Sequence, residues 1–312
     1  MLTRKMTRRI IGIVLTVALI VSSVALAVTA ATAVDTSHPG SLCLTYSYDG
    51  QSFAGIDVAI YHVADITRYG EYSLSGAFAD LPVEVNNIKT QDEWNQVAST
   101  LSAYVTAKEI LPDGKSTTDE NGAVSFGEIP LGLYMVAAVR IEGDTGYYVF
   151  DQFMISLPDL DDEDKWVYDV VAKPKSVFQE FEYEDITYHV NKLWKDEGYA
   201  HKRPQSIDLE LYCNGTLTET VTLSAENNWN YSWTAKDDGS IWQVVETDVA
   251  EGYTVTMEQS EASFTVINSY EKPEIPPVTG DVSNIDIYLW IICAAGLGLI
   301  VLGVTGRRRK SE

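Results

Sequence analysis

The chain has 312 residues, of which 46% are hydrophobic, and its 22 basic and 45 acidic side chains give a formal net charge of −23. Such an acidic surface repels nucleic acids and anionic lipids, so we exclude both as partners. Three cysteines exclude a disulfide framework, and the length leaves room for two domains.

The N-terminus has the three parts of a secretion signal. Arg4, Lys5, Arg8 and Arg9 form a positive cluster, an apolar run covers about residues 10–28, and Ala31-Thr32-Ala33 follows. The last three residues have the small-x-small pattern that signal peptidase reads. We predict a signal peptide over residues 1–33. The alternative is an uncleaved anchor, because the apolar run is long for a signal peptide.

The first folded region is predicted to span residues 40–175 and to be mostly β-strand with one helix. Thr90 and Glu93 have the spacing of a capping box. Elsewhere short runs alternate between apolar and polar residues, as at 147–157, and predict strands. The helix is expected over residues 90–107, laid against a sheet, because six residues share one helical face: Trp94, Val97, Ala98, Leu101, Tyr104 and Val105.

An acidic run at residues 161–164 lies at a predicted hairpin. Carboxylates there could hold calcium, but no glycine stands where a calcium loop needs its sharp turn. We therefore favour a solvated turn over a metal site.

The first region contains Gly132-Leu133-Tyr134 and, at residues 153–158, an alternating run that ends in proline. In these stretches it resembles the N-terminal domain of Gram-positive pilins. Such domains often carry a lysine on the first strand and an asparagine partner on the last. This chain has Leu44-Thr45-Tyr46 and Ala172 at those places, so we predict no lysine–asparagine bond in this region.

Residues 166–175 read WVYDVVAKPK and resemble the pilin motif, although Ala172 and Lys173 replace its Val-Tyr pair. In that motif a lysine amine attacks the sortase thioester of the next subunit. The resemblance implies that Lys175 is this acceptor, held at a domain junction that Pro174 stiffens. Two alternatives stay open: Lys173 is the acceptor, or Lys175 is an ordinary linker residue.

An acidic connector at residues 176–187 leads to a second region, residues 188–270. Cys43 and Cys213 fall in different regions, so we expect neither to pair with the other. Seven short strands with brief loops predict a β-sandwich: 188–194, 206–213, 218–224, 229–234, 241–246, 253–257 and 263–270.

Three polar residues fall on the apolar faces of these strands. Because strand side chains alternate with period two, Lys192, Glu246 and Asn268 share their faces with Val190, Trp194, Trp242, Val244, Phe264 and Val266. Burying such groups unpaired would cost several kcal/mol each. Placed together they can react. Desolvation favours a neutral lysine amine and a protonated glutamic acid that polarises the carboxamide.

Loss of ammonia would then leave an amide between the first and last strands. The alternative is a buried Lys–Glu pair with the asparagine as a hydrogen-bond partner. The region also resembles the collagen-adhesin B-type (CnaB) repeat over nearly all of its length. In that family a first-strand lysine bonds to a last-strand asparagine with an acidic residue between them, which implies Lys192, Asn268 and Glu246. The resemblance rests on residues 190–196, 202–204, 225–229, 245–246, 252–253 and 266–270.

A proline-rich stalk at 271–281 contains Pro276-Pro277-Val278-Thr279-Gly280. An uncharged run at 287–304 lies within a predicted membrane helix over 285–306, and a basic tail follows at 307–312. This C-terminal end resembles a sortase cell-wall sorting signal of the LPxTG type, with Pro276 where leucine is usual. The resemblance implies that a sortase cysteine attacks the carbonyl between Thr279 and Gly280. The alternative is a plain membrane-anchored protein with a proline linker.

The predicted fold class is therefore mostly β, with two tandem Ig-like/CnaB-type β-sandwich domains, the first with an inserted helix. Four scattered histidines show no metal spacing, nucleophile–base pattern or phosphate loop, so we predict no enzyme, cofactor or metal site. We predict a structural pilus subunit on the wall of a Gram-positive bacterium. Its expected partners are sortase, other pilin subunits, peptidoglycan and a host surface ligand. The alternative is a monomeric wall-anchored adhesin.

Overall fold

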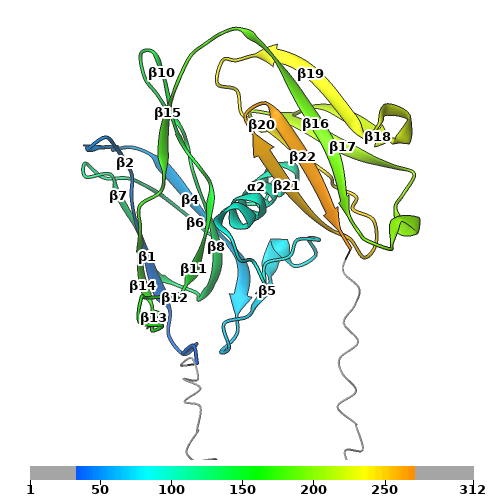
Figure 1. The fold of residues 1–312 in the computed structure, drawn as a ribbon. Coiled ribbons are helices and arrows are strands. Elements are labelled where there is room, and N and C mark those ends of the chain that lie inside the picture. The colour runs from blue at the N-terminus through cyan, green and yellow to red at the C-terminus, as the bar shows by residue number, and fades with distance from the viewer. Residues whose placement is uncertain (1–32, 271–312) are drawn as a thin grey trace, which may run out of the picture. The chain divides into compact units, whose positions relative to one another are not determined.

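The computed structural model describes residues 33–270 (Figure 1). The predicted stalk, sorting motif, membrane helix and basic tail lie outside the described residues, as does nearly all of the predicted signal peptide. Within the described range no helix is both long and apolar enough to cross a membrane.

Two Ig-like β-sandwiches follow one another along the chain. The first is built mainly from two sheets, with strand orders β14-β1-β7 and β11-β8-β4-β5, and β6 is added beside β4. Leu42, Ile60, Phe126 and Val136 fill the space between them. The strands are β1 (Gly40–Thr45), β4 (Asp57–Ile66), β5 (Tyr72–Leu74), β6 (Gly114–Thr117), β7 (Ala123–Ile129), β8 (Gly132–Ala138), β11 (Phe153–Leu157) and β14 (Asp169–Ala172).

Smaller pairs decorate this sandwich. A sheet of order β15-β10-β9 and two short hairpins, β2-β3 and β12-β13, complete the first region. Their bounds are β2 (Ser47–Tyr48), β3 (Gln51–Ser52), β9 (Ile141–Glu142), β10 (Gly146–Phe150), β12 (Asp159–Leu160), β13 (Trp166–Val167) and β15 (Ser176–Glu180), and a short 3-10 helix, η1, covers Gly76–Phe78.

The expected connector between the regions is partly wrong. The acidic residues from 176 onward favour a linker. Val177 and Phe178 are apolar, however, and β15 pairs antiparallel with β10. The run predicted at 147–157 likewise divides into two strands of different sheets, β10 and β11. The acidic run is the expected turn: the Asp161 carboxylate accepts hydrogen bonds from the backbone of Glu163 and Lys165, at 2.9 Å each.

The second sandwich has seven strands where seven were predicted. One sheet has the order β19-β16-β22-β21 and the other β18-β17-β20. The first strand, β16, lies parallel to the last, β22. The bounds are β16 (Asp185–Lys195), β17 (Ser206–Cys213), β18 (Thr216–Ser224), β19 (Asn230–Lys236), β20 (Trp242–Val245), β21 (Thr254–Ser260) and β22 (Ser263–Ser269), with 3-10 turns η2 (Ala200–Lys202) and η3 (Ala225–Asn227). Cys43 and Cys213 are free, as expected, and half-buried.

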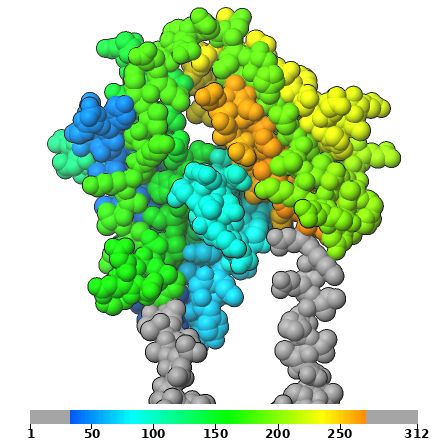
Figure 2. All heavy atoms as spheres, in the orientation of Figure 1, coloured from blue at the N-terminus to red at the C-terminus, as the bar shows by residue number. Residues whose placement is uncertain are grey.

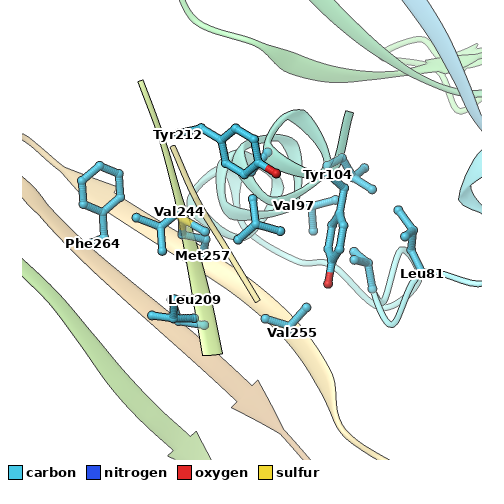
Figure 3. Close-up of a cluster of buried hydrophobic side chains, with 14 of the residues drawn as sticks. Leu81, Val97, Tyr104, Leu209, Tyr212, Val244, Val255, Met257 and Phe264 are labelled. Carbon is cyan, nitrogen blue, oxygen red and sulfur yellow. The ribbon is translucent and has the colours of Figure 1, made fainter. Parts of the chain in front are cut away.

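The predicted helix is confirmed as α2 (Gln91–Ala107), and its N-terminal capping box is present. The Thr90 hydroxyl accepts a hydrogen bond from the Glu93 backbone, and the Glu93 carboxylate accepts one from Thr90. The sequence predicts a helix laid against a sheet. It also packs on β20 and β21 of the second region, because its apolar side chains join one core with Val244, Val255 and Met257 (Figure 3). Figure 2 shows the cyan part of the chain beside the orange strands.

Candidate functional site

The structure brings the three predicted bond-forming residues together inside the second sandwich. Lys192 Nζ lies 3.2 Å from Glu246 Oε2, and the side chains of these two residues are 0% and 1% exposed. Asn268 Nδ2 donates a hydrogen bond to Glu246 Oε1 at 2.9 Å. Asn268 is itself fully buried. A lysine, a carboxyl group and a carboxamide thus share one dry site.

Strand register explains why these residues meet. In the parallel pair β16–β22, Lys192 lies opposite Val266 and Trp194 lies opposite Asn268. Lysine and asparagine therefore sit on adjacent strands, two positions apart, with both side chains facing the core. Glu246 follows directly after β20 in the opposite sheet, so its carboxyl group reaches the site from across the sandwich.

Burial pushes both ionisable groups toward their neutral forms. Desolvation lowers the pKa of Lys192 to about 8, although the neighbouring Glu246 opposes the shift. Desolvation also raises the pKa of Glu246, against the opposing influence of Lys192 and Asn268. A neutral amine is a nucleophile and a protonated carboxyl is a general acid, so these shifts favour the forms that amide chemistry requires.

The site leaves hydrogen-bonding capacity unused. Asn268 Oδ1 has no hydrogen-bond partner among the described residues, and Glu246 Oε2 has only its ion-pair contact with Lys192 Nζ at 3.2 Å. Lys192 Nζ donates to the Val266 carbonyl only across 3.4 Å. Turning the carboxamide over would place Asn268 Oδ1 against Glu246, where a protonated carboxyl can donate to it. Unpaired polar atoms in a core are costly, so the site is costly to bury unless its groups bond to one another.

Aromatic and charged groups close one end of the site. The ring of Trp194 lies 4.5 Å from Lys192 Nζ and packs edge-on against Trp229 and Tyr253. Beyond it the buried carboxylate of Asp196 accepts hydrogen bonds from Arg203 Nε at 2.7 Å and from the Tyr253 hydroxyl at 2.9 Å. This network shields the lysine amine from water.

The predicted acceptor Lys175 lies far along the chain from this triad, in the short segment between β14 and β15. Lys173 and Lys175 are both exposed, while Pro174 between them is half-buried. On either side the segment is fixed by pairing, Ala172 with Leu44 and Ser176 with Phe150. Either amine is therefore accessible on a backbone held at both ends. Pro277, Thr279 and Gly280 lie outside the described residues.

A family model matches the second region of the chain. Residues 188–269 match the model of the Cna protein B-type domain. The second region is a CnaB domain. The "Collagen adhesin" of Staphylococcus aureus is 31% identical over 99 residues, which cover 30% of this chain and 8% of that protein. The chain thus spans only a small part of this relative.

Two solved structures are similar to this chain at low sequence identity. A single B repeat unit of the S. aureus collagen-binding surface protein matches 74% of this chain and 97% of its own, with 17% identity and a TM-score of 0.26. The full-length major pilin SpaD of Corynebacterium diphtheriae matches 76% of this chain and 65% of its own, with 16% identity and a TM-score of 0.28.

One contact at the site was not foreseen from the sequence. The hydroxyl of Tyr104, on α2 of the first region, donates a 2.7 Å hydrogen bond to the backbone carbonyl of Glu246 in the CnaB domain, and the contact is buried. Sequence analysis placed Tyr104 on the apolar face of the helix. Its hydroxyl was the available signal, because a buried tyrosine normally has a hydrogen-bond partner.

Proposed function

We propose that this chain is a structural subunit of a Gram-positive pilus whose CnaB domain closes an isopeptide bond between Lys192 and Asn268. The observation that carries the proposal is the buried cluster of Lys192, Glu246 and Asn268, with both pKa values shifted toward neutral side chains. The position of the cluster between the first and last strands of the domain gives the bond a mechanical purpose.

The reaction needs only these three residues. Neutral Lys192 Nζ attacks Asn268 Cγ while Glu246 donates its proton to Oδ1. The carboxylate then carries a proton from the attacking nitrogen to Nδ2. The tetrahedral intermediate collapses, ammonia leaves, and the proton on Oδ1 returns to Glu246. One C–N bond forms, one breaks, and Glu246 returns to its protonated state.

The bond would carry load. The chain enters the domain through β16 and leaves it through β22, and these strands lie side by side in parallel. Tension between the two ends would shear this pair first. A covalent link between Lys192 and Asn268 passes the load directly from one strand to the other, and the roughly 75 residues between them are never stretched. By analogy with disulfides, closing such a loop stabilises the domain by about 4–5 kcal/mol.

Polymerisation would use the residues at the two other predicted sites. Sortase would cleave after Thr279 and transfer its acyl group to the Lys175 amine of another copy. Exposure of Lys175, on a segment held by paired strands at both ends, supports this role. The final subunit would be joined to peptidoglycan at the cell surface.

A second candidate function is a monomeric wall-anchored adhesin, favoured by the likeness of the CnaB domain to a collagen adhesin. Denaturing gels of cell-wall extracts separate the two. A ladder of covalent multimers supports the pilus subunit, and a single wall-linked band supports the adhesin.

The isopeptide bond is tested by the intact mass of the purified protein. We expect the mass to be lower than the calculated value by one ammonia, and proteolysis to yield a branched peptide containing Lys192 and Asn268. The full calculated mass would contradict the bond. Loss of two ammonia molecules would place a second bond in the first region, against our interpretation of Leu44 and Ala172.

A further inference from the structure

The first region contacts the strand that carries the acid of the proposed reaction. Glu246 follows the last residue of β20, where strand pairing ends, and its backbone carbonyl accepts its hydrogen bond from Tyr104 of α2. The tyrosine is 2% exposed, so this bond lies in the core shared by the two regions. The group that fixes the start of the Glu246 side chain thus comes from outside the CnaB domain.

Other bonds hold the same strand to the helix. The side chain of Gln243, on β20, accepts a hydrogen bond from the Thr106 hydroxyl at 2.8 Å and donates one to the Ser102 hydroxyl at 3.2 Å. Together with Tyr104, these contacts come from two successive turns of α2. The helix therefore fixes β20 at the third residue before Glu246 as well as at Glu246 itself.

The edge of the neighbouring sheet is also paired with the first region. On β21 the backbone N–H of Met257 donates to the Thr100 hydroxyl at 2.8 Å, and that of Val255 donates to the Pro82 carbonyl at 2.8 Å. Apolar packing of Val97 and Tyr104 on Val244 and Val255 fills the space between these bonds (Figure 3). The two regions therefore meet through a dry interface with satisfied polar groups.

We propose that Tyr104 is a positioning residue for the isopeptide reaction, so that the CnaB domain closes its bond efficiently only when α2 of the first region is docked on it. This inference rests on the proposed Lys192–Asn268 bond. With the Glu246 carbonyl fixed, its carboxyl group points inward to Lys192 and Asn268. Without that hydrogen bond, the residue is free to turn toward solvent.

Burial suits the tyrosine to this role. Desolvation, with a smaller contribution from Glu246, raises the pKa of the Tyr104 phenol, so the hydroxyl stays protonated and remains a donor at physiological pH. The covalent bond would then form mainly in correctly assembled chains, because it closes in a CnaB domain that has already docked on the first region.

The test compares Tyr104→Phe with Tyr134→Phe in the full-length chain. Tyr134 is a matched control: it is equally buried and also donates a 2.7 Å hydrogen bond to a backbone carbonyl, that of Pro130, but within the first region. The chain is synthesised in a pulse, extracted in detergent and digested at intervals. The fraction of branched Lys192–Asn268 peptide is then measured by mass spectrometry.

We expect Tyr104→Phe to slow bond formation about tenfold to a hundredfold, since small displacements of a catalytic group have effects of this size, and Tyr134→Phe to leave the rate unchanged. The pH profile supplies a readout that general destabilisation would not move. A Glu246 released toward solvent loses its raised pKa, and Lys192 loses its charged partner, so both limbs of the rate profile should shift to lower pH in Tyr104→Phe alone.

Equal rates in wild type and Tyr104→Phe, or equal slowing by both substitutions, would overturn the inference. If Tyr104→Phe does not accumulate, Thr106→Val serves instead, because it removes one hydroxyl bond to Gln243 at constant size; slower closure supports the inference and an unchanged rate contradicts it. Absence of the branched peptide from wild type would reject the proposed bond itself, a result distinct from failure of the positioning role.

Discussion

The two sandwiches share a parallel pairing of their first and late strands, but they differ in the residues at this junction. In each, the first strand pairs in parallel with a late strand: β1 with β14, and β16 with β22. In the first region Leu44 lies opposite Ala172 at this junction, and the surrounding core is apolar. In the CnaB domain the junction holds Lys192 and Asn268. The parallel junction of the first region therefore forms without a lysine–asparagine pair. The polar cluster of the CnaB domain serves some purpose beyond folding.

The polar junction is also a cost until the bond closes. An ion pair taken out of water gains less than apolar packing of the same volume, and Asn268 Oδ1 has no hydrogen-bond partner among the described residues. Apolar packing stabilises the first region at once. The CnaB domain would gain its full stability only after the reaction. Substitutions at the two junctions should therefore have different consequences.

The largest effect is expected for Asn268→Ala in the CnaB domain. This change removes the electrophile, so the intact mass should equal the calculated value. The domain should lose the roughly 4–5 kcal/mol that loop closure contributes, which lowers its melting temperature. Unfolding followed by calorimetry, with mass measured on the same sample, checks both. A variant that still loses ammonia would show that Asn268 is not the partner.

A smaller effect, of a different kind, is expected for Leu44→Ala in the first region. Leu44 is fully buried, and such a truncation costs about 2–5 kcal/mol through lost burial and the remaining cavity. Denaturant unfolding should report this loss. The mass deficit of one ammonia should persist, because Leu44 does not contact the helix α2 or the triad. Disappearance of the deficit would mean that the two regions are not separable in this way.

Glu246→Ala should leave the fold intact and the bond unformed. Glu246 contributes no atom to the product amide, so only the proton transfers fail. Mass spectrometry should show the full calculated mass over hours, and the circular dichroism spectrum should keep its β signature. Closure at the normal rate in this variant would remove Glu246 from the reaction and leave a passive buried pair.

The rate of closure in the wild-type chain should depend on pH with a bell shape. The reactive pair carries one proton in total, on the carboxyl of Glu246, while Lys192 is neutral. Acidification adds a second proton and produces the ammonium form. Alkalinity removes the shared proton and leaves Glu246 as a carboxylate, which cannot act as a general acid. The rate should therefore fall on both sides of a plateau, and its limbs belong to the pair rather than to either residue.

Stability of the unlinked Asn268→Ala variant should follow the same lysine. Its pKa lies near 8 when folded and near the ordinary 10.5 when unfolded, so the unfolded chain binds more protons between these values. The free energy of unfolding should consequently rise as pH increases through this window. Urea titrations at pH 8 and pH 10 measure the difference, and Lys192→Met, which lacks the titrating amine, should abolish it.

Much of this arrangement could be predicted from local sequence. Period-two alternation located all seven strands of the CnaB domain and placed its three polar residues on core faces. The Thr90–Glu93 spacing located the start of α2. Strand β15 was missed because the acidic residues at and after its C-terminal end, from Glu180 to Asp185, favour a linker over the strand that Val177 and Phe178 form. The docking of α2 on the CnaB domain was missed because an amphipathic pattern predicts that one face of a helix is buried. The pattern does not identify the element that covers this face.

The smallest effect on the fold is expected for Lys175→Arg. Lys175 is exposed and the charge is kept, so stability should change by less than about 0.5 kcal/mol, and the ammonia deficit should remain. The guanidinium group stays protonated and cannot attack an acyl thioester. In cells that assemble the polymer, the high-mass ladder should vanish while wall-linked monomer persists, because anchoring uses Thr279. Lys173→Arg is the matched control, two residues away and also exposed, and should keep the ladder. A ladder lost only with Lys173→Arg would move the acceptor to that residue, and a wild-type chain without a ladder would favour the monomeric adhesin.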